Sequence, residues 1–228
     1  MFDPSKFTVT KSRPIPVILL LDGSGSMNGE KIATLNKAVN EMIDSFKGES
    51  QKEVEIQVAV ITFGGDVKLS LPLTPAVDIS NPELQANGGT PMGAALAMAK
   101  AMIEDKETIP SKGYRPTVVL VSDGLPNDSW QGPMQEFIAS GRSSKCDRMA
   151  MAIGNDGGEE VLKMFLKGTE NQLFHAGDAS SIPQFFRQVT MSVSMRSKSA
   201  DPNKLLPFTS ETAGTGGFDK KIAEITDF

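Results

Sequence analysis

Cysteine and histidine are almost absent from this sequence of 228 residues, which contains one of each, Cys146 and His175. A single cysteine excludes a disulfide within the chain, and one cysteine with one histidine leaves too few soft ligands for a structural zinc site. A chain without disulfides fits a reducing compartment. We therefore expect a protein of the cytoplasm.

A basic excess and long apolar runs are lacking as well. The chain has 23 Lys and Arg against 28 Asp and Glu, a formal net charge of −5, which argues against nucleic acid or an anionic membrane surface as the main partner. The longest early apolar run, residues 17–21, stops at Asp22, so it is too short for a signal-peptide core or a membrane span. We expect a soluble bacterial protein.

The hydrophobic pattern predicts strands that alternate with helices. Residues 15–21 and 117–121 are continuous apolar runs, as in strands buried on both faces. Apolar residues at helical spacing predict a helix over residues 32–46. Residues 54–63 and 67–73 are expected to form two strands of a hairpin. Further helices are expected at residues 91–103, 134–140, 159–166 and 182–193, and further strands at residues 149–153 and 172–175. The order predicts an α/β fold: a doubly wound, mostly parallel sheet with one antiparallel edge strand and helices on both faces.

The sequence indicates one folded domain between two flanking segments. Residues 1–13 are expected to be an N-terminal extension and residues 14–195 the domain itself. Residues 196–228 mix proline, glycine, serine and threonine without any period. We expect this last segment to be an extended or disordered tail.

Small oxygen-bearing side chains occur at three expected loops. Asp22, Ser24 and Ser26 follow the first strand, Asp123 follows the strand of residues 117–121, and Thr90 immediately precedes a helix. In an open parallel sheet, ligand sites form where strands end at their carboxyl edge. Mg²⁺ prefers hard oxygen ligands and retains water, and Mn²⁺ accepts the same set. We predict that these five residues hold Mg²⁺ or Mn²⁺; if the hydroxyls coordinate directly and the aspartates act through water, the ion attracts an external carboxylate.

Helix capping is the alternative explanation for these residues. Asp and Ser before a helix accept hydrogen bonds from its free N–H groups. Thr90 can cap the helix that starts at Pro91 and still bind a metal. Two such loops on one sheet edge are hard to explain by capping, so we favour the metal site.

The pattern Asp22-x-Ser24-x-Ser26 with Thr90 and Asp123 resembles the metal-ion-dependent adhesion site of von Willebrand factor A domains and integrin inserted domains. The resemblance covers about residues 14–194 and implies a Rossmann-like fold whose bound metal grips a glutamate or aspartate of a partner protein. Residues 88–93 and 122–128 are similar more narrowly to the bacterial tellurium-resistance TerY group. That similarity implies a stress or phosphorylation-signalling system, with a protein kinase and a PP2C-type phosphatase as partners.

Two other classes of function compete with a binding module. An enzyme is disfavoured because Glu30 stands where a P-loop needs lysine, the Gly-x-Ser-x-Gly elbow is absent, and no second histidine is available for a triad. Mg²⁺-dependent hydrolysis stays open in principle. A partner-binding subunit of a chelatase-like AAA-ATPase complex also stays open, although it needs a separate motor. We expect a metal-dependent protein-interaction module and not an enzyme.

Overall fold

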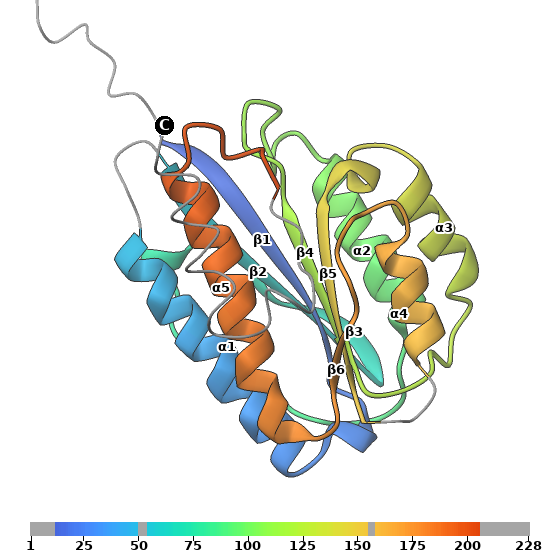
Figure 1. Ribbon diagram of the computed structural model, residues 1–228. Coiled ribbons are helices and arrows are strands. Elements are labelled where there is room, and N and C mark those ends of the chain that lie inside the picture. Colours follow the sequence, from blue (N-terminus) through green and yellow to red (C-terminus); the bar gives the residue numbers. More distant parts are fainter. Residues whose placement is uncertain (1–11, 50–53, 155–157, 206–228) are drawn as a thin grey trace, which may run out of the picture.

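The computed structural model describes residues 12–49, 54–154 and 158–205. Within these ranges the strands form one six-stranded sheet of order β3-β2-β1-β4-β5-β6 (Figure 1). The strands are β1 (Arg13–Asp22), β2 (Val54–Gly64), β3 (Asp66–Pro75), β4 (Thr117–Ser122), β5 (Asp147–Ile153) and β6 (Phe174–Ala176). Strand β3 is antiparallel to β2, and the other neighbouring pairs are parallel. The predicted sheet is therefore confirmed, with its antiparallel strand at the edge.

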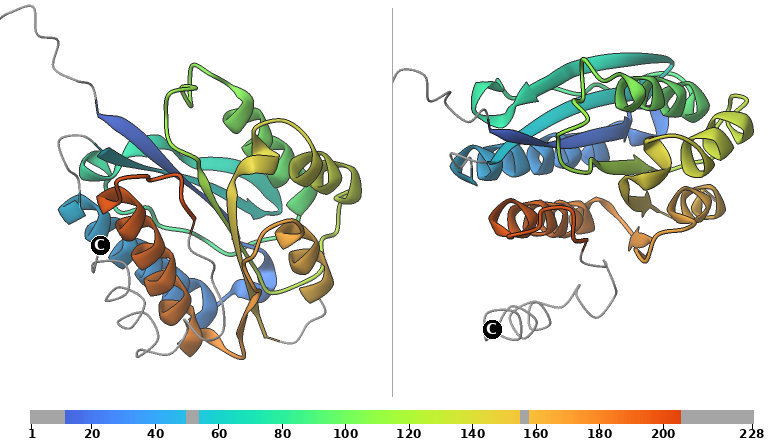
Figure 2. Two further views of the ribbon diagram at one scale, coloured as in Figure 1. Left: turned by 45° about the horizontal axis from the view of Figure 1, so that its top comes forward. Right: turned by 90° about the horizontal axis from the view of Figure 1, so that it is seen from above.

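Helices cover both faces of the sheet. One face carries α1 (Glu30–Glu49) and α5 (Ile182–Lys198), and the other carries α2 (Met92–Glu104), α3 (Gln131–Ala139) and α4 (Glu159–Leu166). Figure 2 shows α1 and α2 on opposite sides of β1. Among the described residues, no helix is both long and apolar enough to cross a membrane. The layers are those of a Rossmann-like α/β fold.

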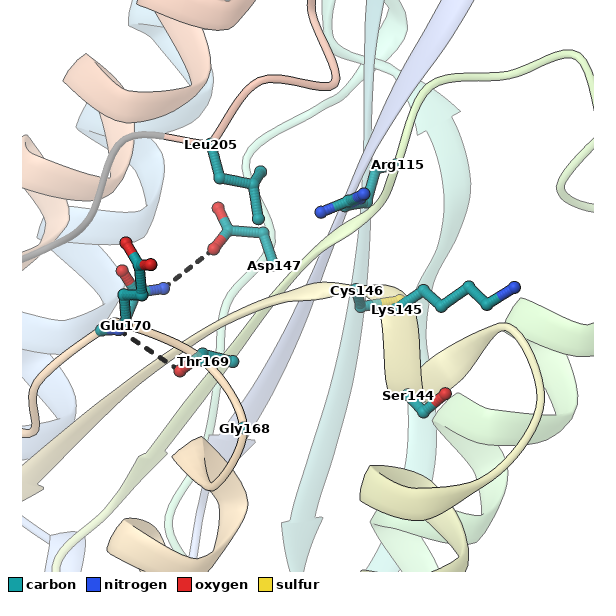
Figure 3. Close-up of a pocket in the computed structure, with 10 residues that line it drawn as sticks. Arg115, Ser144, Lys145, Cys146, Asp147, Gly168, Thr169, Glu170 and Leu205 are labelled. Carbon is teal, nitrogen blue, oxygen red and sulfur yellow. Dashed lines mark hydrogen bonds between the residues drawn. The ribbon is translucent and has the colours of Figure 1, made fainter.

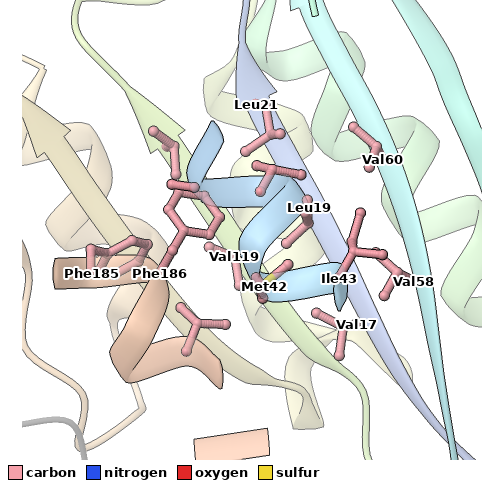
Figure 4. Close-up of a cluster of buried hydrophobic side chains, with 14 of the residues drawn as sticks. Val17, Leu19, Leu21, Met42, Ile43, Val58, Val60, Val119, Phe185 and Phe186 are labelled. Atoms are coloured by element: carbon pink, nitrogen blue, oxygen red, sulfur yellow. The ribbon is translucent and has the colours of Figure 1, made fainter. Parts of the chain in front are cut away.

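Strand β1 contributes side chains to both hydrophobic clusters, because successive residues of a strand point to opposite faces. Val17, Leu19 and Leu21 pack with α1 and α5 (Figure 4). Ile18 and Leu20 belong to the cluster under α2, α3 and α4. Since both faces are covered, the strand needs apolar residues at every position, which explains its unbroken apolar run.

Two buried arginines lie near the amino ends of β4 and β5. Arg148 donates to the carbonyl oxygens of Phe165, Ser144 and Lys167 at 2.8, 2.9 and 2.8 Å. Arg196 donates to Thr117 Oγ1 at 2.6 Å and to the carbonyl oxygens of Pro202 and Arg115 at 2.8 and 2.5 Å. Both guanidinium groups therefore have the partners that a buried charge needs.

Helix α5 continues to Lys198, past residue 195, where the sequence places the end of the domain. Arg196 joins the segment after this helix to the sheet through Pro202. Residues 1–11 and 206–228 lie outside the described part of the chain. The expected division into extension, domain and tail stays a prediction.

Cys146 is 3% exposed, and burial raises the pKa of its thiol to about 12. Because the thiolate is the reactive form, we expect the native protein at pH 8 to react with an aromatic disulfide reagent at least about a hundredfold more slowly than the unfolded chain. The absorbance of the released thiol measures both rates. Labelling at equal rates in buffer and in guanidinium would contradict this burial.

Candidate metal centre

The ends of β1 and β4 lie side by side because these strands pair in parallel, with Leu21 opposite Val121. Asp22 is the last residue of β1, and Asp123 directly follows β4. A short 3-10 helix, Gly25–Met27, turns the loop after β1 so that Ser26 meets Asp123. The sheet register therefore brings these two loops together at one edge.

Four of the five predicted residues are joined by hydrogen bonds of their side chains. Asp22 Oδ1 accepts the Ser24 N–H at 2.8 Å, and Ser24 Oγ lies 3.0 Å from Ser26 Oγ. Ser26 Oγ donates to Asp123 Oδ1 at 2.7 Å. Asp22, Ser24 and Asp123 are buried, whereas Ser26 is exposed. The cluster is thus open to solvent at the Ser26 hydroxyl.

Asp22 is held by a residue that the sequence analysis missed. Ser122, the last residue of β4, donates its hydroxyl to Asp22 Oδ2 at 2.5 Å. Burial raises the pKa of Asp22, the hydrogen bonds from Ser122 and Ser24 oppose that rise, and the charge of Asp123 adds to it. A polar residue at the end of a buried strand, directly before Asp123, was the signal available in the sequence.

Thr90 joins the site through its backbone. Its N–H donates to Asn127 Oδ1 at 3.0 Å, and its carbonyl accepts the Asn127 N–H at 3.1 Å. The hydrogen bonds of Thr90 to other described residues all use its backbone. The structure therefore fixes Thr90 beside the loop that carries Asp123 and leaves its hydroxyl without a described partner.

Helix capping does not account for the side chains of Ser24 and Thr90. Ser24 precedes the 3-10 helix, but its side chain makes no capping hydrogen bond to a backbone N–H of that helix. At the start of α2, the N–H groups of Gly93 and Ala94 donate to the carboxylate of Asp128 at 3.0 and 2.9 Å. Asp128 thus performs the capping role that was considered for Thr90, from the neighbouring loop.

Close glycine contacts fix the loop after β1, the hairpin between β2 and β3, and the segment before Thr90 against one another. The N–H of Gly25 donates to the Gly88 carbonyl at 2.9 Å, and the N–H of Asn87 donates to the Gly23 carbonyl at 2.7 Å. A Cβ on Gly64 would meet Gly23 O at 2.0 Å, and a Cβ on Gly88 would meet Gly65 Cα at 2.4 Å. Any larger residue at these positions separates the loops.

Lys31 adds a cation that the sequence analysis did not assign to the site. Its Nζ lies 2.6 Å from Asp123 Oδ2. Both carboxylate oxygens of Asp123 are therefore engaged, one by the Ser26 hydroxyl and one by an ammonium group. A lysine in the first turn of an amphipathic helix carries no local signal of such a contact.

The donor set fits a small, hard divalent cation. Neighbouring ligand oxygens of an octahedron with bonds of about 2.0–2.1 Å lie about 2.9 Å apart. Ser24 Oγ and Ser26 Oγ, the two serine oxygens that would bind the ion directly, lie 3.0 Å apart, close to that edge. Among the described residues, no group of three or more His, Cys, Asp or Glu side chains could hold a metal. A metal here would depend on hydroxyl oxygens, which Mg²⁺ and Mn²⁺ accept.

A pocket of about 460 Å³ lies at the other end of the sheet, beside the first residues of β5 (Figure 3). Asp147, in its wall, accepts the Asn171 side-chain N–H at 2.8 Å and lies 4.0 Å from Arg196 Nη1. Burial raises the pKa of Asp147, and the charge of Arg196 opposes that rise. These contacts explain Asp147 as part of the buried polar network of this edge.

A model of the von Willebrand factor type A domain family matches residues 17–188. Matrilin-3 of Gallus gallus is 24% identical over 177 residues, which cover 74% of this chain and 38% of that protein. Inter-alpha-trypsin inhibitor heavy chain H4 of Bos taurus is 24% identical over 192 residues, which cover 77% of this chain and 20% of that protein. The chain therefore spans less than half the length of these curated relatives.

Solved structures share the fold. A von Willebrand factor type A protein of Catenulispora acidiphila has a TM-score of 0.63 at 24% identity, over 81% of this chain and 43% of that one. Proximal thread matrix protein 1 of the mussel byssus, with a zinc-occupied MIDAS motif, has a TM-score of 0.60 at 17% identity, over 83% of this chain and 47% of that one. At such identities the likeness shows the fold alone.

Replacing Gly88 by alanine should destabilise the protein more than the same change at Gly29. Both glycines have a positive φ, +69° and +83°, but a Cβ at Gly29 meets nothing within 4 Å. We expect a loss of about 1 kcal/mol for Gly29→Ala, from the backbone alone, and at least about 3 kcal/mol for Gly88→Ala, where backbone atoms also collide. Urea unfolding measures both losses of stability. Equal values would contradict the close backbone contact between Gly88 and Gly65.

Proposed function

Because the chain belongs to the von Willebrand factor type A domain family, we propose that it is a protein-interaction module that uses a divalent cation, preferably Mg²⁺, to bind an acidic residue of a partner. Ser24, Ser26 and Thr90 bind the cation directly. Asp22 and Asp123 act through water molecules.

The observation that carries this proposal is the contact between Ser26 and Asp123, which lie 97 positions apart in the sequence. The contact places a surface hydroxyl on a buried carboxylate, with Ser24 Oγ 3.0 Å from the same hydroxyl. Neither serine hydroxyl is occupied in capping a helix. An oxygen cluster of this composition is suited to a hard cation.

The roles of the side chains follow from their present partners. Asp22 accepts from Ser24 and Ser122, so its two oxygens are already oriented and its charge is partly compensated. Neutral hydroxyl ligands leave the positive charge of a bound cation largely intact. When bound, that cation supplies a coordination position for the partner's carboxylate. Leu125, two residues after Asp123 and 59% exposed, supplies an apolar contact beside it.

The partner is proposed to belong to a bacterial stress or phosphorylation-signalling system of the cytoplasm, as a protein kinase or a PP2C-type phosphatase. The support is the similarity of residues 88–93 and 122–128 to the tellurium-resistance TerY group. These two segments contact each other through Thr90 with Asn127 and through Gly93 with Asp128. The two similar segments are therefore neighbours in the structure, and each contains a predicted metal ligand, Thr90 or Asp123.

Binding is favoured over catalysis by the placement of the ionisable groups. His175, the sole histidine, lies on β6, which β4 and β5 separate from β1. Its Nδ1 lies 3.2 Å from Glu159 Oε1, so it faces α4. Asp22 is itself bound on both oxygens, which disfavours it as a base that activates water.

Thr90→Val should abolish Mg²⁺ binding, because valine has the shape of threonine but offers no oxygen ligand. Thr90→Ser restores a hydroxyl and should bind Mg²⁺ within about tenfold of the wild type. Isothermal titration calorimetry measures both affinities. Since the hydrogen bonds to Asn127 use the backbone, melting curves without metal should show that both variants remain folded. Unchanged affinity in the valine variant would remove Thr90 from the site.

Capture of the partner from a lysate of the source cell should require metal. We expect the tagged wild-type chain to retain the partner in Mg²⁺ or Mn²⁺, to release it in EDTA, and to regain it when Mg²⁺ is restored. Thr90→Val is the matched control, because it should capture nothing in any buffer. Mass spectrometry identifies a kinase, a phosphatase or an AAA-ATPase. Equal capture in EDTA would assign the binding to another surface.

A further inference from the structure

Lys31 brings a positive charge into contact with a predicted metal ligand, Asp123. Its Nζ lies 2.6 Å from Asp123 Oδ2, while the Asp123 side chain is 0% exposed and that of Lys31 is 27% exposed. A charge-assisted contact of this length to a shielded carboxylate is among the stronger polar interactions in proteins. The ion pair is therefore part of the site and not a loose surface contact.

The position of Lys31 in its helix is unfavourable by itself. Lys31 is the second residue of α1, and the amino end of a helix carries a partial positive charge that repels cations. Asp123, from a loop 92 positions away, compensates for this repulsion. The contact between the two residues thus joins α1 to the loop after β4.

We propose that Lys31 is a tethered cation that competes with the divalent ion for Asp123. This inference rests on the proposed function, since it concerns the same metal centre. Without metal, Lys31 neutralises Asp123 and holds the two loops together. Metal binding requires its ammonium group to move away from Asp123 Oδ2.

The competition follows from the occupancy of the Asp123 carboxylate. One oxygen accepts from Ser26, and Lys31 holds the other. A divalent ion that draws on Asp123, directly or through water, meets a positive charge within a few Å, and like charges at that range repel strongly even in a partly hydrated site. The lysine stem is flexible and partly exposed, so the ammonium group can withdraw into solvent.

Removal of the charge should therefore strengthen metal binding, which is the opposite of what loss of a ligand does. We expect Lys31→Met to bind Mg²⁺ about tenfold more tightly than the wild type, the order expected for one unit charge beside a divalent ion in a hydrated site. Lys31→Arg keeps the charge and should stay within about threefold of the wild type. Lys37→Met makes the same change on an exposed face of α1, and its affinity should not change.

Calorimetric titration of the full chain with MgCl₂ alone tests the proposal, with Lys31→Gln as a second neutral variant if Lys31→Met does not fold. Melting curves give an independent readout: without metal the neutral variant should melt below Lys37→Met, and Mg²⁺ should raise its melting temperature more than that of the wild type.

The outcomes separate this proposal from the metal centre itself. If the wild type binds Mg²⁺ and neutral variants bind it equally or more weakly, the role of Lys31 is refuted and the metal centre stands. If neither the wild type nor a neutral variant binds Mg²⁺ or MnCl₂ at millimolar concentrations, both proposals are refuted. Lys31 is then a structural ion pair alone.

Discussion

The parallel pairing of β1 with β4 is the constraint on which the site depends. This pairing sets the ends of the two strands at one level, so that Ser122 reaches Asp22 and Ser26 reaches Asp123. Asp22 then orients the backbone of Ser24, which starts the turn that carries Ser26. All of these contacts depend on two apolar strands that are buried on both faces and pair in parallel.

Electrostatics gives this arrangement its chemical character. Two buried carboxylates in one cluster repel each other, and the raised pKa of Asp22 reflects both burial and the nearby charge of Asp123. Hydrogen bonds from hydroxyl and backbone donors lower the free-energy cost of burying these carboxylates, and Lys31 supplies one positive charge. With both carboxylates ionised, the three charged groups leave one negative charge uncompensated. A cluster in this state favours a further cation.

The sequence predicted the parts of the molecule that have a local signal. The apolar run of β1, the hairpin at Gly64 and Gly65, and the alternation of strands and helices specify the sheet, because burial of one or both faces dictates the residue pattern. The five oxygen-bearing residues were predicted from their positions at three loops, and hydrogen bonds link four of them in the structure; their role as metal ligands stays a prediction. Lys31 was missed because its partner lies 92 positions away and nothing in the neighbouring residues reports such a contact. Ser122 was missed although it directly precedes Asp123, because its hydrogen bond is to Asp22, 100 positions away. The buried pairing of Arg196 with the start of β4 was missed for the same reason.

The two ends of the parallel strands carry different kinds of contact. At the amino ends, Arg148 and Arg196 donate hydrogen bonds to backbone carbonyls and fix the segments around the strand starts. At the carboxyl edge, glycines let the loops pack backbone against backbone, with Gly64 and Gly88 too close to Gly23 and Gly65 for any side chain. The conformational entropy of these loops is therefore lost during folding and not during binding. A site that is ordered in advance retains more of its interaction energy as affinity.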